Sequence, residues 1–242
     1  MPDSHLSPTS KQLKQRALLV QRGGVRAAVL GVNDGLVSTV CLVVGIAATG
    51  AQASTVLVTG LAGLLAGAIS MAAGEWISVK AQVELFEGVL TDLKASMHDE
   101  KAHLVHSLAH TLASGGMEIH TAHQASKDIA RNDDHFVAIY TSQVIGMNKD
   151  ELGSPWRAAI ASFALFAVGA LVPILPWLVG GGMLALVASV IATSLAGLVV
   201  GGYIARSSGK SIPYGSLRQL LIILGSSFVT YGIGYIFGVS VS

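Results

Sequence analysis

The sequence predicts an all-α membrane protein with five transmembrane helices and a cytoplasmic helical domain, of about three helices, inserted between the second and the third. Of the 242 residues, 52% are hydrophobic and only 12% are charged, whereas soluble domains carry about 25% charged residues. The charges lie in blocks, and the apolar stretches between these blocks are long enough for helices that cross a bilayer, which need about 20 residues each.

The positions of the charged residues divide the chain into segments. Between Arg26 and Lys80 the only ionisable acids or bases are Asp34 and Glu75, and residues 158–205 carry no charge. The transmembrane helices are therefore expected at about 25–49, 54–79, 157–178, 181–204 and 215–239. The corresponding domains are a cytoplasmic N-terminal segment at 1–24, transmembrane helices 1 and 2 at 25–79, a cytoplasmic helical, metal-binding domain at 80–155, and transmembrane helices 3 to 5 at 156–242.

The basic residues predict the orientation of the chain. All 15 Lys and Arg residues lie in the N-terminal segment, in residues 80–157, or around the loop before the last helix. Five helices place these regions on one side of the membrane, and basic residues are enriched on the cytoplasmic side. The N-terminus and the 80–155 domain are thus expected in the cytoplasm, and the C-terminus outside or in a lumen. The N-terminal segment lacks the apolar core of a cleaved signal peptide. A prokaryotic inner membrane is expected, and a vacuole-like membrane is the alternative.

The 80–155 segment is expected to be helical. Apolar residues recur in steps of four, which is the spacing of one helix face, at Leu85, Val89 and Leu93 and again at Leu104, Leu108 and Leu112. Gly115 and Gly116 are expected to end this helix. Two further helices are predicted at about 117–130 and 133–147.

Two helical faces in the membrane carry candidate transport residues. A carboxylate in a transmembrane helix is costly and normally faces a cavity or a partner, so Asp34 is the leading candidate. Ser38 and Cys41 follow it at i+4 and i+7, and their hydroxyl and thiol could extend a path for a transition metal. Met71 and Glu75 share a face of the next helix in the same way. For Ser38, Cys41 and Met71 the alternative is simple packing between helices.

Histidines form the second signal, because seven of the eight lie in the 80–155 segment. Neutral imidazole is a ligand for Zn²⁺, Cu²⁺, Fe²⁺ and Ni²⁺. A solvated or pH-responsive surface is the alternative. The candidate metal ligands here are His103, His106 and His110, spaced i, i+3 and i+7, then Asp99 one turn earlier, Glu100 in a Glu-x-x-His spacing, and His120 and His123 on the next helix.

The apolar helices also resemble a known family. The stretches GVNDGLVSTVCLVVGIAATGA, GLAGLLAGAISMAAGEWISVKAQVELFE, DELGSPWRAAIASFALFAVGALVPILP and SLRQLLIILGSSFVTYGIGYIFG are similar to transmembrane helices of the vacuolar iron transporter family. The resemblance implies a homodimer that moves Fe²⁺, and often Mn²⁺, out of the cytoplasm in exchange for protons. It also implies that Asp34 and Met71 are the membrane metal ligands and that Glu75 is the glutamate of the second helix.

The chain departs from this family in the 80–155 segment. The family gathers metal there with glutamates, of which Glu84 and Glu87 remain, while histidines follow downstream and Lys80 adds a cation. Either the domain binds metal with a preference shifted toward Zn²⁺, Co²⁺ or Ni²⁺, or it retains only a structural or gating role.

These observations predict a secondary transporter of divalent transition metal ions rather than an enzyme. The ion is its substrate, no tightly bound cofactor is expected, and the partners are metal ions, protons, the lipid membrane and a second copy of the chain. Nucleic acid is not expected, and the net charge of +1 gives no indication of it. The alternatives are a membrane-bound metal or pH sensor without transport and, more remotely, a ferroxidase, which would need a second Glu-x-x-His motif.

Overall fold

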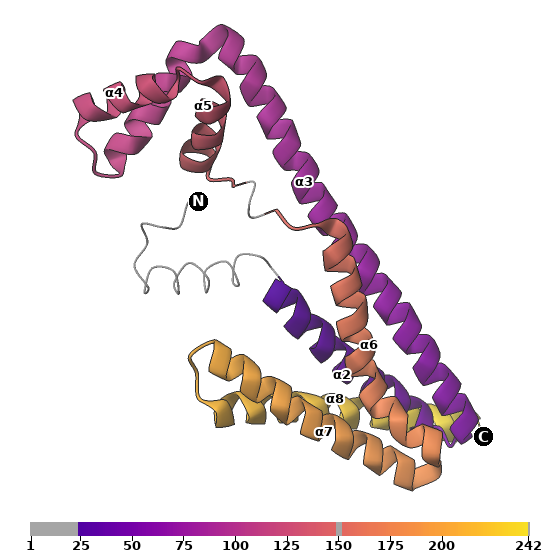
Figure 1. Ribbon diagram of the computed structural model, residues 1–242. Helices are drawn as coiled ribbons and strands as arrows, with labels where there is room; N and C mark the ends of the chain where they lie inside the picture. Colours follow the sequence, from indigo (N-terminus) through magenta and orange to yellow (C-terminus); the bar gives the residue numbers. More distant parts are fainter. Residues whose placement is uncertain (1–23, 149–151, 242) are drawn as a thin grey trace. The chain divides into compact units, whose positions relative to one another are not determined.

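The computed structural model describes residues 24–148 and 152–241, and every regular element in these ranges is helical (Figure 1). Of the predicted N-terminal segment 1–24, all but Gly24 lies outside the described residues. The described chain forms two compact units, one comprising residues 24–76 and 155–241 and the other comprising residues 77–148 and 152–154.

The first unit is a bundle of apolar helices. It contains α2 (Gly24–Ala48), the beginning of α3 (Ala53–Ser114), α6 (Pro155–Val179), α7 (Gly182–Ser207) and α8 (Ile212–Val241). Five helices among the described residues are long and apolar enough to cross a membrane, as the charge pattern predicted. The predicted ends agree with the observed ones except that α3 continues far beyond residue 79. The cytoplasmic placement of residues 80–155 stays a prediction.

Glycines allow the helices of the bundle to approach closely. A Cβ atom on Gly35 of α2 would lie 2.3 Å from the Phe166 carbonyl oxygen of α6, and one on Gly169 would lie 2.3 Å from the Val32 carbonyl oxygen. Such backbone-to-backbone contact is the usual role of small residues between membrane helices. It makes α2 and α6 one tightly packed pair, and α2 also packs against α7 and α8.

In the second unit, α3 is kinked at Glu100, whose backbone is not helical (φ −124°, ψ 19°). Figure 1 shows the helix changing direction there. Leu93 and Met97 before the kink therefore share a hydrophobic core with Leu108 after it and with Phe136. The predicted apolar face is buried only in part: Leu93 and Leu108 are buried, whereas Leu85 is 68% exposed and its neighbour Phe86 is buried instead.

Short helices complete the second unit. α4 spans Ile119–Ile129, α5 spans Asp133–Tyr140, and a π-helical turn, η1, spans Thr141–Ile145. Asn132 caps α5 through a hydrogen bond from the His135 amide (3.0 Å). Lys101 and Asp133 form an ion pair at 2.6 Å, which joins the part of α3 after the kink to α5.

Glu118 caps the N-terminus of α4, and the stability of this cap depends on pH. Its carboxylate accepts a hydrogen bond from the Thr121 amide at 2.8 Å. Hydrogen bonds from the backbone amides of His120 and Thr121 lower the pKa of Glu118. A carboxylate whose pKa is lower in the folded state stabilises the fold above its unfolded pKa, and this contribution is lost as the pH falls through the folded pKa.

Glu118→Gln is therefore expected to weaken the first turn of α4 near neutral pH and to have little effect at acidic pH. Hydrogen exchange of the α4 amides, measured in both proteins at each pH, would show faster exchange in the variant only at the higher pH. A difference that is constant across the titration would mean that the charge of Glu118 does not support the cap.

Candidate metal-transport site

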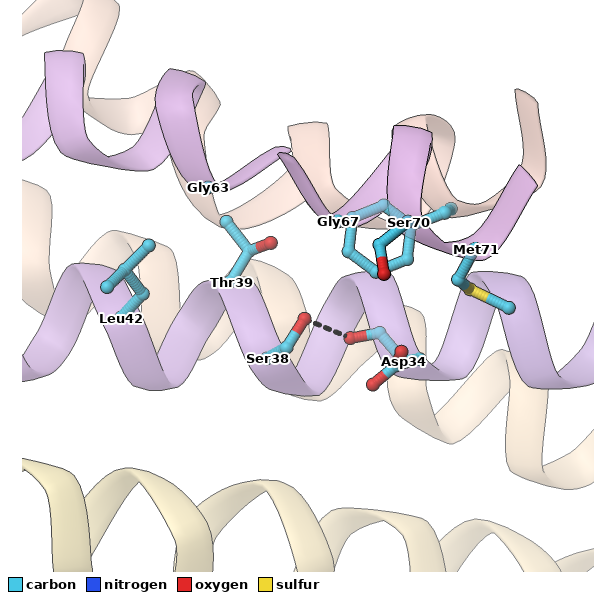
Figure 2. A pocket seen from close by; sticks show the side chains of 9 residues that line it. Asp34, Ser38, Thr39, Leu42, Gly63, Gly67, Ser70 and Met71 are labelled. Atoms are coloured by element: carbon cyan, nitrogen blue, oxygen red, sulfur yellow. Dashed lines mark hydrogen bonds between the residues drawn. The ribbon is translucent and has the colours of Figure 1, made fainter. Parts of the chain in front are cut away.

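A pocket of about 230 Å³ lies in the apolar bundle between α2, α3 and α6. Figure 2 shows the residues that line it. Asp34 is the only charged residue among them, and a thioether and three hydroxyls supply the other polar groups. The lining residues are Asp34, Ser38, Thr39 and Leu42 from α2, Gly63, Gly67, Ser70 and Met71 from α3, and Phe166 from α6.

The α2 wall presents oxygen atoms. Asp34 and Ser38 are exposed in the single chain, whereas Thr39 is buried. The Ser38 hydroxyl donates a hydrogen bond to the backbone carbonyl of Asp34 at 2.5 Å (Figure 2). Because the Ser38 proton is used in this bond, the lone pairs of its oxygen remain available to a ligand in the pocket.

The α3 wall lies opposite and presents Ser70 and Met71, whose side chains point toward α2 (Figure 2). Met71 was predicted to act together with Asp34, whereas Ser70, which directly precedes Met71 on α3 and also lines the pocket, was not predicted. The hydroxyl residues Thr39 and Ser70 have no distinctive spacing, since serine and threonine are common in membrane helices as packing residues. The pocket thus combines carboxylate, hydroxyl and thioether groups.

Glycines give the pocket its shape. A Cβ atom on Gly67 would lie 2.2 Å from Cζ of Phe166, and one on Gly63 would lie 2.3 Å from Cδ2 of Leu42. Phe166 is buried, so its ring closes the pocket because Gly67 leaves room for it.

Gly67→Ala is expected to displace the Phe166 ring and to destabilise the bundle by about 1–3 kcal/mol, the usual cost of overpacking. Gly74→Ala on the same helix is the matched control, because a Cβ atom there would meet nothing within 4 Å. Thermal unfolding in detergent should show a lower Tm for Gly67→Ala and little change for Gly74→Ala. Equal values of Tm for both variants would contradict a tight contact at Gly67.

Cys41 and Glu75 are not among the pocket-lining residues. At about 100° per residue, Cys41 lies about 60° from Ser38, on the far side of Asp34, and it packs against the cluster of Val40, Val44 and Ile223. Glu75 is half-buried one turn beyond Met71. Its neighbour Trp76 packs edge-on against Trp156 of α6, with 5.9 Å between ring centroids.

A polar contact next to Asp34 joins α2 to α8. The Gln219 amide donates a hydrogen bond to the side-chain oxygen of Asn33, and Gln219 is buried. A buried hydrogen bond between membrane helices can hold them in register. This pair was not predicted from the sequence, although amide side chains within two apolar helices indicate a polar contact between them.

The predicted ligands of the 80–155 segment are only partly brought together. Glu84 pairs with Lys80 at 3.2 Å, Asp99 contacts His98 at 3.0 Å, and Glu87 and His103 are exposed. The kink at Glu100 separates Asp99 from the histidine stripe. His120 is exposed, while the rings of His106, His110 and His123 lie in mutual contact. Within the described residues, no three His, Cys, Asp or Glu side chains are positioned to hold a metal ion as they stand.

Comparison with known proteins places the chain in a family. The model described as the VIT family matches residues 25–235. The chain belongs to the VIT family. This confirms the resemblance to vacuolar iron transporters that was inferred from the apolar helices.

Several curated proteins resemble this VIT-family chain over most of its length. Vacuolar iron transporter homolog 1 of Oryza sativa subsp. japonica is 34% identical over 221 residues, which cover 88% of this chain and 74% of that protein. Vacuolar iron transporter homolog 4 of Arabidopsis thaliana is 33% identical over 198 residues, which cover 82% and 75% of the two chains. The similarity therefore extends well beyond a single helix.

Proposed function

We propose that this VIT-family protein is a secondary transporter that exports divalent transition metal ions from the cytoplasm in exchange for protons, with Fe²⁺ and Mn²⁺ as the first candidates. The observation that carries the proposal is the pocket of the apolar bundle that is lined by both Asp34 of α2 and Met71 of α3. The names of the related plant proteins support a metal ion as the cargo.

The donors of the pocket suit a partly dehydrated transition metal ion. Carboxylate and hydroxyl oxygens favour hard cations such as Mn²⁺, while a thioether favours softer ones. Fe²⁺ lies between these classes, so Asp34 and Met71 together favour it over Ca²⁺ or Mg²⁺. Ser38 and Ser70 would supply further oxygen ligands, and no role is assigned to Cys41.

Proton exchange follows from the chemistry of one carboxylate. Asp34 can hold either a proton or a metal ion, but not both at once. Protonated Asp34 is neutral and therefore less costly inside the bilayer than the free carboxylate. Alternate occupancy would couple inward proton movement to outward metal movement. Glu75, one turn from Met71, would pass protons or guide the ion toward the pocket.

The cytoplasmic carboxylates would act before the pocket. Glu84 and Glu87 are exposed on α3 and would raise the local concentration of cations there. Lys80 forms an ion pair with Glu84 and neutralises its charge. Glu87 would therefore attract cations more strongly than Glu84. Asp99, Glu100, His103 and His120 would contribute only as members of a polar, solvated surface.

A homodimer in a membrane is the proposed working form. Asp34 and Ser38 are exposed on a single chain, and a carboxylate that faces lipid is costly. A second copy placed over this face would remove that cost. The proposed orientation has the 80–155 domain in the cytoplasm and the C-terminus outside or luminal, in a prokaryotic inner membrane or a vacuole-like one.

The test is a flux measurement on the whole protein in liposomes. Fe²⁺, Mn²⁺, Co²⁺, Ni²⁺ and Zn²⁺ should be offered one at a time, with and without a pH gradient, while internal pH is followed with a dye. We expect metal movement to be faster when the proton gradient drives protons in the direction opposite to the metal ion. Metal binding without flux would instead support the sensor alternative, and flux that does not respond to the gradient would contradict proton exchange.

A further inference from the structure

Three histidines from two helices form a cluster in the second unit. His106 and His110 lie on α3 after the kink, and His123 lies on α4. The ring centroids are 4.7 Å apart for His106 and His110, 5.2 Å for His106 and His123, and 6.5 Å for His110 and His123. We propose that His106, His110 and His123 form a binding site for a borderline divalent metal ion such as Zn²⁺ or Co²⁺, separate from the pocket of the bundle.

The spacing of the rings fits three ligands of one ion. A Zn–N bond is about 2.0–2.1 Å, which places each imidazole centroid about 3.2 Å from the metal, so tetrahedral ligands have centroids about 5.2 Å apart. Two of the observed separations, 4.7 and 5.2 Å, are close to this value, and the third, 6.5 Å, exceeds it by a little over 1 Å. The i, i+4 spacing of His106 and His110 is also that of the two histidines of helical zinc sites.

The backbone around the cluster is held, while the side chains are able to rotate. Leu108 lies between the two α3 histidines and is completely buried, and Ile129 of α4 packs against the same core. Ala122, next to His123, is also completely buried. His106 and His110 are exposed and His123 is half-buried, and exposed side chains change rotamer within nanoseconds. Small rotations would therefore turn the ring nitrogens toward a common ion, an arrangement that the side chains do not adopt as they stand.

The donor set determines the class of ion. Three neutral imidazoles suit Zn²⁺, Co²⁺, Ni²⁺ and Cu²⁺, whereas Mg²⁺, Ca²⁺ and Mn²⁺ prefer oxygen. Three protein ligands leave the fourth tetrahedral position to water or to an exchangeable ligand. A site of this kind releases its ion more readily than a closed four-ligand site would. The proposal does not depend on transport through the bundle.

The test is a Co²⁺ titration of the purified full-length protein, followed by visible absorption, in the wild-type and Asp34→Asn backgrounds. The triple variant H106A/H110A/H123A should lose the tetrahedral Co²⁺ bands in both backgrounds. The matched control H98A/H103A/H120A removes three exposed histidines of the same unit and should keep the bands. If the flux proposal fails, this readout is unaffected, because it does not involve Asp34.

A single substitution tests whether loss of binding in H106A/H110A/H123A results from misfolding. His123→Gln should weaken Co²⁺ binding by at least about tenfold, the lower limit of what even outer-shell changes cost at metal sites, with an unchanged circular dichroism spectrum. Bands that survive in H106A/H110A/H123A, or that disappear equally in the control, would overturn the site. Unchanged affinity in His123→Gln would overturn the assignment of His123.

Discussion

Asp34→Asn is expected to abolish metal-driven proton flux, with a loss of at least about 100-fold, while the protein stays folded. The substitution keeps nearly the same volume but removes the only charged group among the residues that line the pocket. Outer-shell changes at metal sites already cost about 10–100-fold, and loss of a directly ligating carboxylate should cost more. The neutral amide also cannot hold a proton in exchange, so metal movement and proton movement should disappear together.

The measurement is Fe²⁺ flux with simultaneous detection of internal pH in liposomes. Asp92→Asn is the matched control, because Asp92 is an exposed carboxylate of α3 that lies outside the apolar bundle. It should transport like the wild type. Full flux in Asp34→Asn would exclude this carboxylate as the transport ligand, and loss of metal flux with a persistent proton leak would separate the two roles assigned to it.

Met71→Leu is expected to change selectivity more than overall stability. Leucine has a volume similar to that of methionine, so packing in the bundle should change little, but the sulfur is lost. Soft and borderline ions depend on the thioether more than hard ions do. Fe²⁺ and Co²⁺ flux should therefore fall by about tenfold, and Mn²⁺ flux should fall less. The ratio of initial Fe²⁺ and Mn²⁺ rates measures the effect directly.

Met97→Leu provides the control for Met71→Leu. Met97 is buried in the core of the second unit, so its replacement removes a thioether without touching the pocket. The ratio of Fe²⁺ to Mn²⁺ rates should be unchanged there. An unchanged ratio in Met71→Leu as well would mean that the sulfur packs against its neighbours and does not bind the ion.

The membrane helices were predictable because the bilayer imposes a simple constraint. A span needs about 20 apolar residues. Residues 27–79, whose only charged side chains are Asp34 and Glu75, and residues 158–205, which carry no charge, meet this requirement. The kink of α3 was harder to foresee. The apolar steps of four pause between Leu93 and Leu104, which marks the kink at Glu100, but that pause has the same appearance as a polar patch on a straight helix.

From the sequence, the residues of the pocket could be predicted only where their spacing along one helix places them on the same face. Asp34 and Ser38 at i, i+4 do line one pocket with Met71. Cys41 does not, because sharing one half of a helix does not decide which neighbour that half contacts. His123 could be noted from sequence, but its proximity to His106 and His110 depends on how α4 packs beside α3, which no local pattern encodes.

The two walls of the pocket differ in mechanical character. Gly35 and Gly169 bring the backbones of α2 and α6 into direct contact, so the wall that carries Asp34 is rigid. The wall that carries Met71 meets its neighbours through the Leu42 and Phe166 side chains, and a methionine side chain is itself adaptable. One fixed ligand and one adjustable ligand in the same pocket can fit cations of different ionic radius. We therefore expect this protein to accept a series of transition metals with graded rates rather than a single ion.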